Sequence, residues 1–493
     1  MVAKHMERSD IFRSQGLNSA EQYLKTLCDR SFLSLWSFSN PYKKVGRELC
    51  DLLVVFGNDI IIFSDKNCRF DPNIEIDIGW SRWFRSTVLA GAKQAQGACR
   101  SISTNPSQIF LDAKCAQQLP YQVSISEKTR FHLVVTLHGI SDHCRTYFPG
   151  SSGSLMLTND PELSGRPFTV GDFNNPKNFV HVFDDESMDI VLKNLDTVSD
   201  FVTYLNKKEK FLRSSVTVFA SGEEELLAEY LSNLNENEEH DFLPLPGSQE
   251  PTRIFYAEGA YDELIKNPRW IERTRQDQIS YAWDRLIEEF SKHALNGTQY
   301  FSTGGGVYTA EKILRFMAAE SRFKRRMLAK ALFEILEQTP SDTRFLRVLL
   351  PDKPEDPCFL LLLFPWRDDK IEEQNRMVRS EFLSVCLRIA KLEYPDVNDF
   401  VGFATESGLE RGRRSEDVAY FDARHWTDED AKQARIDQKE LSILVSAVKV
   451  GFHEDEYPKK SLEGKLLVPI PKNPRNKLCP CGSGKKFKKC HGL

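Results

Sequence analysis

The sequence lacks any apolar run long enough to cross a membrane. Its longest apolar run, Phe359–Phe364, has six residues and is followed by Pro365, whereas a helix that spans a bilayer needs about 20 residues. A run this short suits a buried strand. The first ten residues are polar and carry charges of both signs, so we expect no signal peptide there. The sequence therefore predicts a protein without a membrane partner.

A secreted disulfide framework is absent as well. The chain has 11 cysteines, and eight of them are scattered singly between Cys28 and Cys386. Small secreted scaffolds instead concentrate their cysteines in a short chain. The other three lie within the last fifteen residues, in a pattern that requires reduced thiols. We therefore expect a cytoplasmic protein.

A strong net charge is missing too, but the charge is unevenly distributed. The 493 residues carry a net charge of −5, and their 41% hydrophobic and 28% charged residues are typical of a soluble protein with two or three globular domains. From Gly464 onward there are eight Lys and Arg residues and no acid, which leaves −13 on the rest of the chain. A basic tail suits contact with phosphates or with an acidic partner; it equally suits solubility and charge compensation alone.

The last fifteen residues hold four candidate metal ligands. Cys479 and Cys481 form one close pair and Cys490 and His491 form another, with two glycines and four lysines in the loop between them. Two such pairs can supply the tetrahedral ligand set that Zn²⁺ prefers, and the lysines favour thiolate over thiol. A segment this small cannot bury a core, so zinc binding must supply its folding free energy. The alternative is a disordered basic tail with incidental cysteines.

These residues closely resemble the SEC-C motif, a module found at the C-terminus of the bacterial preprotein translocase ATPase and of many otherwise unrelated proteins. The resemblance covers residues 477–493. It implies a small zinc knuckle that docks on a protein partner or on nucleic acid. The preceding residues 456–476 include four prolines, and we expect them to form a tether.

The clearest secondary-structure signal is a hairpin. The apolar runs Asp51–Phe56 and Ile60–Phe63 flank the turn-forming residues 57–59, which predicts two antiparallel strands. Because both runs are apolar on both faces, we expect both strands in the middle of a sheet. A helix over Lys43–Cys50 is expected before the hairpin, and another over Ser81–Cys99 after it.

The remaining pattern predicts an α/β protein of several domains. Residues 1–232 should form an α/β domain, the acidic and Pro-rich stretch 233–252 a linker, and residues 253–455 a helix-rich α+β domain of unknown role. The other expected elements are helices at 19–28, 188–208, 281–294, 311–337 and 371–392, and strands at 131–137, 154–157, 180–183, 215–220, 358–364 and 400–404.

Candidate catalytic residues flank the hairpin. Asp51 opens the first strand, and Asp65 and Lys66 close the second; Glu48 precedes the hairpin, and Gln94 lies on the helix expected after it. Hydrolysis of a phosphodiester needs a divalent cation to polarise the phosphate and activate a water. Mg²⁺ prefers carboxylate oxygens, and a nearby lysine can stabilise developing charge. Residues on either side of a hairpin turn lie opposite one another, so the sequence predicts a Mg²⁺ or Mn²⁺ site at these strand ends.

This order of residues resembles the PD-(D/E)XK nuclease superfamily over roughly residues 20–130. The resemblance implies a restriction-endonuclease-like core with Asp51 as the ligand of the metal ion. It also implies that Glu48 or Asp65 assists, that Lys66 orients the attacking water, and that Gln94 or Lys93 supports the site.

One residue departs from the pattern of that superfamily. The position two residues before Lys66 should hold an acid, but Ser64 stands there. In a regular strand Asp65 points to the face opposite Lys66. A bulge could turn the side chain of Asp65 toward Lys66, or Glu48 could serve as the second ligand. Otherwise the site is degenerate, and the domain binds without catalysing a reaction.

Two weaker patterns allow alternative interpretations. The residues between Arg322 and Lys330 form a basic helical face that suits a nucleic-acid backbone, but the flanking acids Glu320 and Glu334 fit a solvated, salt-bridged face at least as well. The histidines of His138–His143 suggest a metal site, yet no third ligand is evident nearby, and structural or surface histidines fit better.

Two hypotheses follow for function. In the first, the protein is a cytoplasmic, metal-dependent nuclease acting on DNA or RNA in bacterial defence or DNA processing, with a zinc tail that recruits it to nucleic acid or a partner. In the second, the N-terminal domain is catalytically silent. The protein is then a zinc-dependent adaptor that binds a protein or nucleic-acid partner through its tail.

Overall fold

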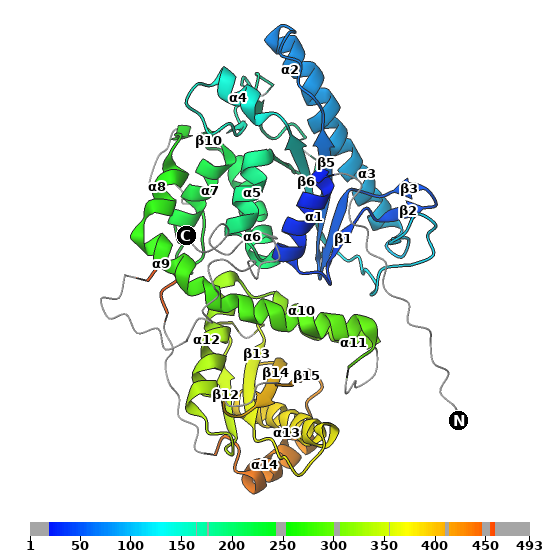
Figure 1. The fold of residues 1–493 in the computed structure, drawn as a ribbon, viewed down its shortest axis with the longest axis vertical. Helices are drawn as coiled ribbons and strands as arrows, with labels where there is room; N and C mark the ends of the chain where they lie inside the picture. The colour runs from blue at the N-terminus through cyan, green and yellow to red at the C-terminus, as the bar shows by residue number, and fades with distance from the viewer. Residues whose placement is uncertain are drawn as a thin grey trace. The chain divides into compact units, whose positions relative to one another are not determined.

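The computed structural model describes residues 19–163, 165–174, 177–242, 253–299, 306–353, 355–409, 414–445 and 454–458. The described residues form two compact units that divide between Thr274 and Arg275 (Figure 1). Both units combine sheets with helices, which confirms a mixed α/β protein of more than one domain. Most of the expected tether and the whole expected zinc knuckle lie outside the described residues.

The first unit contains a five-stranded sheet in the order β1–β4–β5–β6–β9. The hairpin predicted at Asp51–Phe63 is confirmed, because β4 and β5 pair antiparallel with Val55 opposite Ile60 and occupy interior positions of this sheet. β5 pairs parallel with β6, and β6 pairs parallel with β9. The five strands are β1 (Ser37–Ser39), β4 (Leu52–Phe56), β5 (Asp59–Asn67), β6 (Arg130–His138) and β9 (Val180–Phe183).

Helices cover both faces of this sheet. α3 (Ala90–Thr104) packs on β5 and β6 from one side, whereas α1 (Ser19–Phe32) and α5 (Asp185–Asn194) pack on the other. α2 (Ile76–Phe84) continues through a π-helical turn (Arg85–Leu89) directly into α3, so the three form one long rod (Figure 1). The expected helix at Ser81–Cys99 is confirmed within this rod, which extends beyond both of its predicted ends.

The prediction of a helix over Lys43–Cys50 is wrong. Residues Lys43–Cys50 form a small hairpin of β2 (Tyr42–Lys44) and β3 (Arg47–Glu48) instead of a helix. Gly46, with a φ of +65°, makes the turn between the strands, a left-handed conformation that ends a helical path. The backbone N–H of Tyr42 donates to the carbonyl of Phe110, so a partner distant in sequence holds this segment extended.

A second sheet of the first unit has the order β11–β10–β7–β8. β11 pairs parallel with β10, so the residues from 253 onward begin within the first unit. The helix expected over residues 188–208 is two helices, because Thr197 caps the second one by accepting a hydrogen bond from the N–H of Asp200. The elements are β7 (Met156–Thr158), β8 (Thr169–Val170), β10 (Thr217–Ala220), β11 (Arg253–Tyr256), α4 (Ser141–Tyr147), α6 (Val198–Leu212), α7 (Glu223–Ser232) and α8 (Ala260–Lys266).

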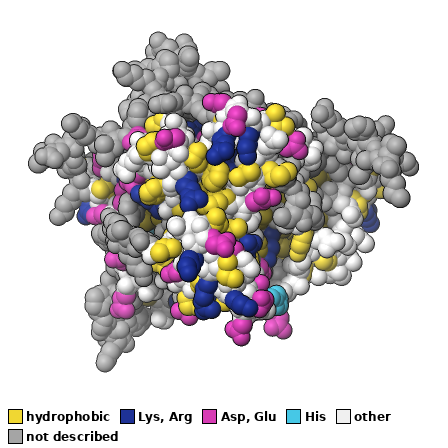
Figure 2. Space-filling model, turned by 90° about the horizontal axis from the view of Figure 1, so that it is seen from below, with side chains coloured by type: hydrophobic (Ala, Val, Ile, Leu, Met, Phe, Trp, Pro, Cys, Tyr) yellow, Lys and Arg dark blue, Asp and Glu magenta, His cyan; other side chains and the backbone are white. Residues whose placement is uncertain are grey.

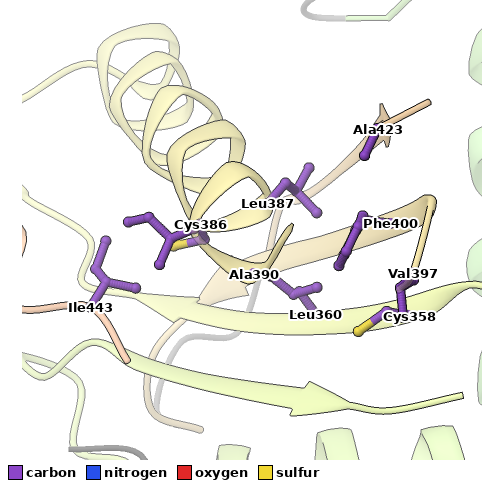
Figure 3. Close-up of a cluster of buried hydrophobic side chains, with 10 residues drawn as sticks. Cys358, Leu360, Cys386, Leu387, Ala390, Val397, Phe400, Ala423 and Ile443 are labelled. Carbon is purple, nitrogen blue, oxygen red and sulfur yellow. The ribbon is translucent and has the colours of Figure 1, made fainter. Parts of the chain in front are cut away.

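The second unit is built on a four-stranded sheet in the order β12–β13–β14–β15. α13 lies across β13 and β14 and closes an apolar core that includes Leu360, Cys386 and Phe400 (Figure 3). The strand expected at Cys358–Phe364 is confirmed as β13, whereas the helix expected over 311–337 is broken at Ser321, which caps α12. The elements are β12 (Phe345–Leu349), β13 (Cys358–Phe364), β14 (Asp399–Glu406), β15 (Glu416–Asp422), α10 (Tyr281–Asn296), α11 (Gly306–Ala318), α12 (Arg322–Gln338), α13 (Glu372–Glu393) and α14 (Asp428–Leu441), with α9 (Pro268–Gln276) and a 3₁₀ turn (Asp277–Ser280) before them.

The basic face of α12 is internal. Arg322, Arg325 and Arg326 are 3%, 1% and 0% exposed. Arg322 and Arg325 share the carboxylate of Asp284 at 2.8 and 2.7 Å, and Arg326 pairs with Asp277 at 3.0 Å. These arginines are salt-bridged, as one of the two interpretations expects, but they are buried rather than solvated.

Among the described residues, no helix is both long and apolar enough to cross a membrane. On the face seen in Figure 2, the Lys and Arg side chains that are described stand among Asp, Glu and hydrophobic side chains, without one sign of charge covering that face.

Candidate functional site

The site lies at one end of the central sheet of the first unit. Asp51 directly precedes β4, Lys66 lies near the end of β5, and Gln94 lies on α3. The antiparallel pairing of β4 and β5 places the start of one strand beside the end of the other, with Leu52 opposite Phe63. The structure therefore brings together three of the residues that the sequence analysis selects.

A closed set of hydrogen bonds joins these residues. The Asp51 carboxylate accepts the backbone N–H of Asp65 at 2.6 Å and the amide of Gln94 at 3.0 Å. The side-chain oxygen of Gln94 in turn accepts from Nζ of Lys66 at 2.6 Å and from the hydroxyl of Ser64 at 3.0 Å. Nζ of Lys66 lies 3.6 Å from the Asp51 carboxylate. Gln94 thus links the ammonium group of Lys66 to the carboxylate of Asp51.

Gly91 allows α3 to approach the sheet closely enough for these contacts. A Cβ atom at Gly91 would lie 2.8 Å from a methyl carbon of Val135 and 3.4 Å from Cγ of Lys66. Real Cβ atoms do not approach a neighbour that closely, so any larger residue would push the helix away. Gln94 is three residues further along α3 and lies on the same face of the helix.

The site is shielded from water but open on one side. Side chains of Asp51 and Lys66 are 12% and 19% exposed. Burial raises the pKa of Asp51, while the positive charge of Lys66 and the hydrogen bonds from Asp65 and Gln94 act in the opposite direction. The arrangement keeps the Asp51 carboxylate and the Lys66 ammonium side by side and partly shielded from water, where each interacts strongly with an incoming charged group.

Asp65 faces the other side of the sheet, as strand alternation predicts. Its carboxylate accepts the hydroxyl of Thr136 at 2.5 Å and contacts Nε2 of His138 at 2.7 Å. Nδ1 of the same histidine lies 2.7 Å from the carboxylate of Asp185 on α5. Burial disfavours the charged imidazole, but the two carboxylates outweigh burial and raise the pKa of His138 to about 10. β5 shows no bulge that would bring the Asp65 side chain toward Lys66.

Glu48 lies on β3 rather than on a helix. Its carboxylate accepts a hydrogen bond from the hydroxyl of Tyr42, which faces it across the small hairpin, at 3.4 Å. Lys93, the neighbour of Gln94, is exposed on α3. The hydrogen-bonded set at the sheet end is therefore Asp51, Ser64, Lys66 and Gln94.

Sequence reasoning missed the ion-paired histidine on the far face. His138 ends β6, and β6 pairs parallel with β5 so that His138 stands opposite Asn67. The signal for it was the His138–His143 segment that follows a predicted strand, because parallel strands end at the same edge of a sheet. His143, in contrast, packs its ring against Phe70 at a centroid distance of 5.0 Å.

The oxygen atoms of the site suit a hard cation, with few protein ligands. Asp51 supplies the single available carboxylate, because the side-chain oxygen of Gln94 already accepts hydrogen bonds from Lys66 and Ser64. Mg²⁺ is commonly held by one or two carboxylates, with waters and substrate phosphates completing its octahedron. The donor set therefore fits a metal ion that arrives with a phosphate group.

Comparison with known proteins identifies only the end of the chain. The SEC-C motif family matches residues 475–493, which confirms the motif assigned there and supports metal binding by this segment. The protein translocase subunit SecA of Campylobacter jejuni subsp. doylei is 40% identical over 58 residues, which are 12% of this chain and 6% of that protein. No solved structure matches the chain. The predicted zinc ligands Cys479, Cys481, Cys490 and His491 lie outside the described residues.

Proposed function

We propose that the first unit is a metal-dependent nuclease that hydrolyses phosphodiester bonds of DNA or RNA. The observation that carries the proposal is the contact between Asp51, Lys66 and Gln94 at the sheet end. A carboxylate that can hold a metal ion and a lysine that can stabilise developing charge, both partly buried, suit phosphate hydrolysis.

Each residue has a distinct role in this proposal. Asp51 holds Mg²⁺ or Mn²⁺, which polarises the phosphate and lowers the pKa of a bound water. Lys66 interacts with the phosphate oxygens and orients the attacking water. Gln94 fixes both side chains, because its amide donates to Asp51 and its oxygen accepts from Lys66. The resemblance to PD-(D/E)XK nucleases supports these roles, since the Asp, the Lys and the following helix occur in the same order.

The single carboxylate of the site shapes what we expect of the metal. Ser64 occupies the position of the second acid and donates its hydroxyl to Gln94. With one carboxylate, the free protein should bind Mg²⁺ weakly and gain affinity when substrate phosphate is present.

The C-terminal segment supplies recruitment in the same proposal. Cys479, Cys481, Cys490 and His491 bind Zn²⁺ and fold the last residues into a knuckle. The match to the SEC-C motif supports this assignment, and the eight basic residues from Gly464 onward favour an acidic partner surface or a nucleic-acid backbone.

Cleavage assays with matched variants test the nuclease. Supercoiled plasmid and single-stranded RNA are incubated with Mg²⁺ or Mn²⁺ and the full-length protein. We expect Asp51→Asn and Lys66→Met each to lower cleavage by at least about 100-fold. Lys93→Met, on an exposed neighbour of Gln94, should leave it unchanged. Cleavage that survives both Asp51→Asn and Lys66→Met would place the activity elsewhere.

A zinc-dependent adaptor is the second candidate, and Ser64 favours it. A serine where an acid is needed is the change expected of a site that keeps its fold and loses its metal. An adaptor would bind its protein or nucleic-acid partner without added Mg²⁺ and would lose that binding with Cys479→Ser or Cys490→Ser. A nuclease would lose cleavage with Asp51→Asn even when its partner binding is intact.

A further inference from the structure

Three carboxylates from two separate parts of the chain converge in the first unit, away from the sheet-end site. Glu224 and Glu225 lie in the first turn of α7, and Glu258 lies in the turn between β11 and α8. One carboxylate oxygen from each residue lies within 4.8 Å of the others. Glu224 and Glu225 are each 2% exposed, whereas Glu258 is exposed. The cluster is therefore buried on one side and open to solvent on the other.

The charge of this cluster is not balanced by the protein. The preceding residue, Glu223, forms a buried ion pair with Lys208 and accepts the hydroxyl of Tyr204 at 2.6 Å. Within the described residues, neither Glu224, Glu225 nor Glu258 has a Lys or Arg side chain within ion-pair distance. A buried carboxylate without a counter-charge is costly. A cation or a proton has to offset this charge.

One oxygen of Glu224 points to what is missing. Its Oε1 accepts the hydroxyl of Ser152 at 2.5 Å, but its Oε2 is buried and has no hydrogen-bond partner. Buried acceptor atoms are almost always satisfied by a donor, a water or an ion. An unsatisfied oxygen of a buried carboxylate, beside two further carboxylates, is the arrangement that a cation completes.

The other two carboxylates are held in place by backbone donors. Glu225 accepts the N–H groups of Gly259 and Tyr261 at 2.8 and 3.0 Å, and Glu258 accepts the N–H of Ser152 at 2.6 Å. These bonds fix the position of each carboxylate and leave lone pairs on the same oxygens. The three groups are thus oriented before any ion arrives.

We propose that Glu224, Glu225 and Glu258 bind a hard divalent cation, with Ca²⁺ the best fit. Ca²⁺ accepts six to eight oxygen ligands in flexible geometry, which suits carboxylates that come from a helix and a turn, with waters on the exposed side. The cation would tie the loop at Ser152 and the start of α8 to the first turn of α7. This site is separate from the proposed nuclease centre and from the zinc tail.

Calorimetric titration of the zinc-loaded, full-length protein tests the proposal. The Asp51→Asn variant serves as background, so that binding at the sheet-end site does not contribute. Ca²⁺, Mg²⁺ and Mn²⁺ are titrated in turn, and the midpoint of thermal unfolding is recorded with and without each ion. We expect one Ca²⁺ site and a higher midpoint with Ca²⁺.

Matched variants locate that site. Glu258→Gln, at an exposed position where folding should not suffer, should weaken Ca²⁺ binding by at least tenfold and abolish the shift in midpoint. Glu263→Gln, an exposed residue of α8, should change neither. Equal Ca²⁺ binding by the Glu258→Gln protein would overturn the proposal. So would the absence of any ion effect together with a higher midpoint for Glu224→Gln alone, because a bound proton would then balance the cluster.

Discussion

The two units of the protein use clustered charges in different ways. On α12 of the second unit, Arg322 and Arg325 are almost fully buried and share the carboxylate of Asp284 at ion-pair distance. At the sheet end of the first unit, Asp51 and Lys66 remain partly exposed and 3.6 Å apart, with an amide between them. The first arrangement holds helices together, whereas the second leaves an anion and a cation able to engage a third group. A basic or acidic sequence pattern alone does not distinguish them.

The largest effect is expected from breaking the buried charge cluster. Asp284→Ala leaves two buried arginines without their carboxylate, which should lower the free energy of unfolding by about 3–5 kcal/mol. Urea unfolding followed by tryptophan fluorescence measures this, because Trp283 is buried on the same helix. Lys292→Ala on α10 removes an ion pair with Glu289 whose side chains are 59% and 63% exposed, and it should change stability by less than about 1 kcal/mol. Equal losses of unfolding free energy in Asp284→Ala and Lys292→Ala would show that burial does not determine how much an ion pair stabilises the protein.

A smaller effect should follow from disturbing the helix that positions the sheet-end site. Gly91→Ala places a Cβ 2.8 Å from Val135, and overpacking of this kind destabilises by about 1–3 kcal/mol. The cleavage rate should fall with it, because α3 carries Gln94. Gly97→Ala on the same helix meets nothing closer than 4.0 Å and should stabilise by about 0.5–1 kcal/mol. Thermal unfolding of the two variants side by side is the measurement, and a neutral Gly91→Ala would contradict the close packing.

The amide between the two charges should matter for activity more than for stability. Gln94→Ala removes the hydrogen bonds to Asp51 and Lys66. Because both side chains are partly exposed, water replaces these bonds in the folded protein but does not hold the two charged groups in their positions. We expect cleavage to fall by about 10- to 100-fold, with less than about 1 kcal/mol lost in unfolding. Cleavage rates at saturating Mg²⁺ are the readout. A large loss of stability with unchanged cleavage would contradict this prediction. Gln94 would then support the fold, as the ion pairs of α12 do, rather than the reaction.

A pH dependence is expected from the far face of β5. The pKa of His138 is raised from 6.5 to about 10 in the folded protein. Its contribution to stability should therefore be complete below about pH 6.5 and should be lost as the pH rises to about 10. The difference in unfolding free energy between the wild type and His138→Gln, measured from pH 6 to pH 10, should shrink across this window. A constant difference would exclude an ion pair with Asp65 and Asp185.

Elements with strong local signals were predictable from the sequence. The hairpin of β4 and β5, the strand Cys358–Phe364 and the helix that contains Gln94 are all confirmed. Their apolar runs are long, and turn or cap residues bound them. Chain breaks inside long helical patterns were missed, because a capping Thr197 or Ser321 looks like any polar residue of a helix surface.

Features that depend on distant partners were not predictable. The Lys43–Cys50 segment follows a helical pattern but is held extended by Phe110. The candidate site was predicted as far as Asp51, Lys66 and Gln94, because the hairpin register follows from local sequence. The contact of His138 with Asp65 requires the parallel pairing of β5 and β6, which joins segments more than 60 residues apart, and the same histidine also contacts Asp185. No local pattern encodes that register.

The π-helical turn sets the rotation of one end of the α2–α3 rod relative to the other. Hydrogen bonds from residue i to i+5 accommodate an additional residue between Arg85 and Leu89, and each residue of an α-helix advances its direction by about 100°. Trp80 before the turn packs against Phe168, while Gly91 after it fits against Val135. Because the π turn takes up one additional residue, deleting one residue there would leave a regular α-helix with both ends of the rod in register, whereas a deletion elsewhere in the rod would rotate one end relative to the other by about 100°. Trp80 and Gly91 can both make their contacts because the π turn changes the rotation of the helix between them.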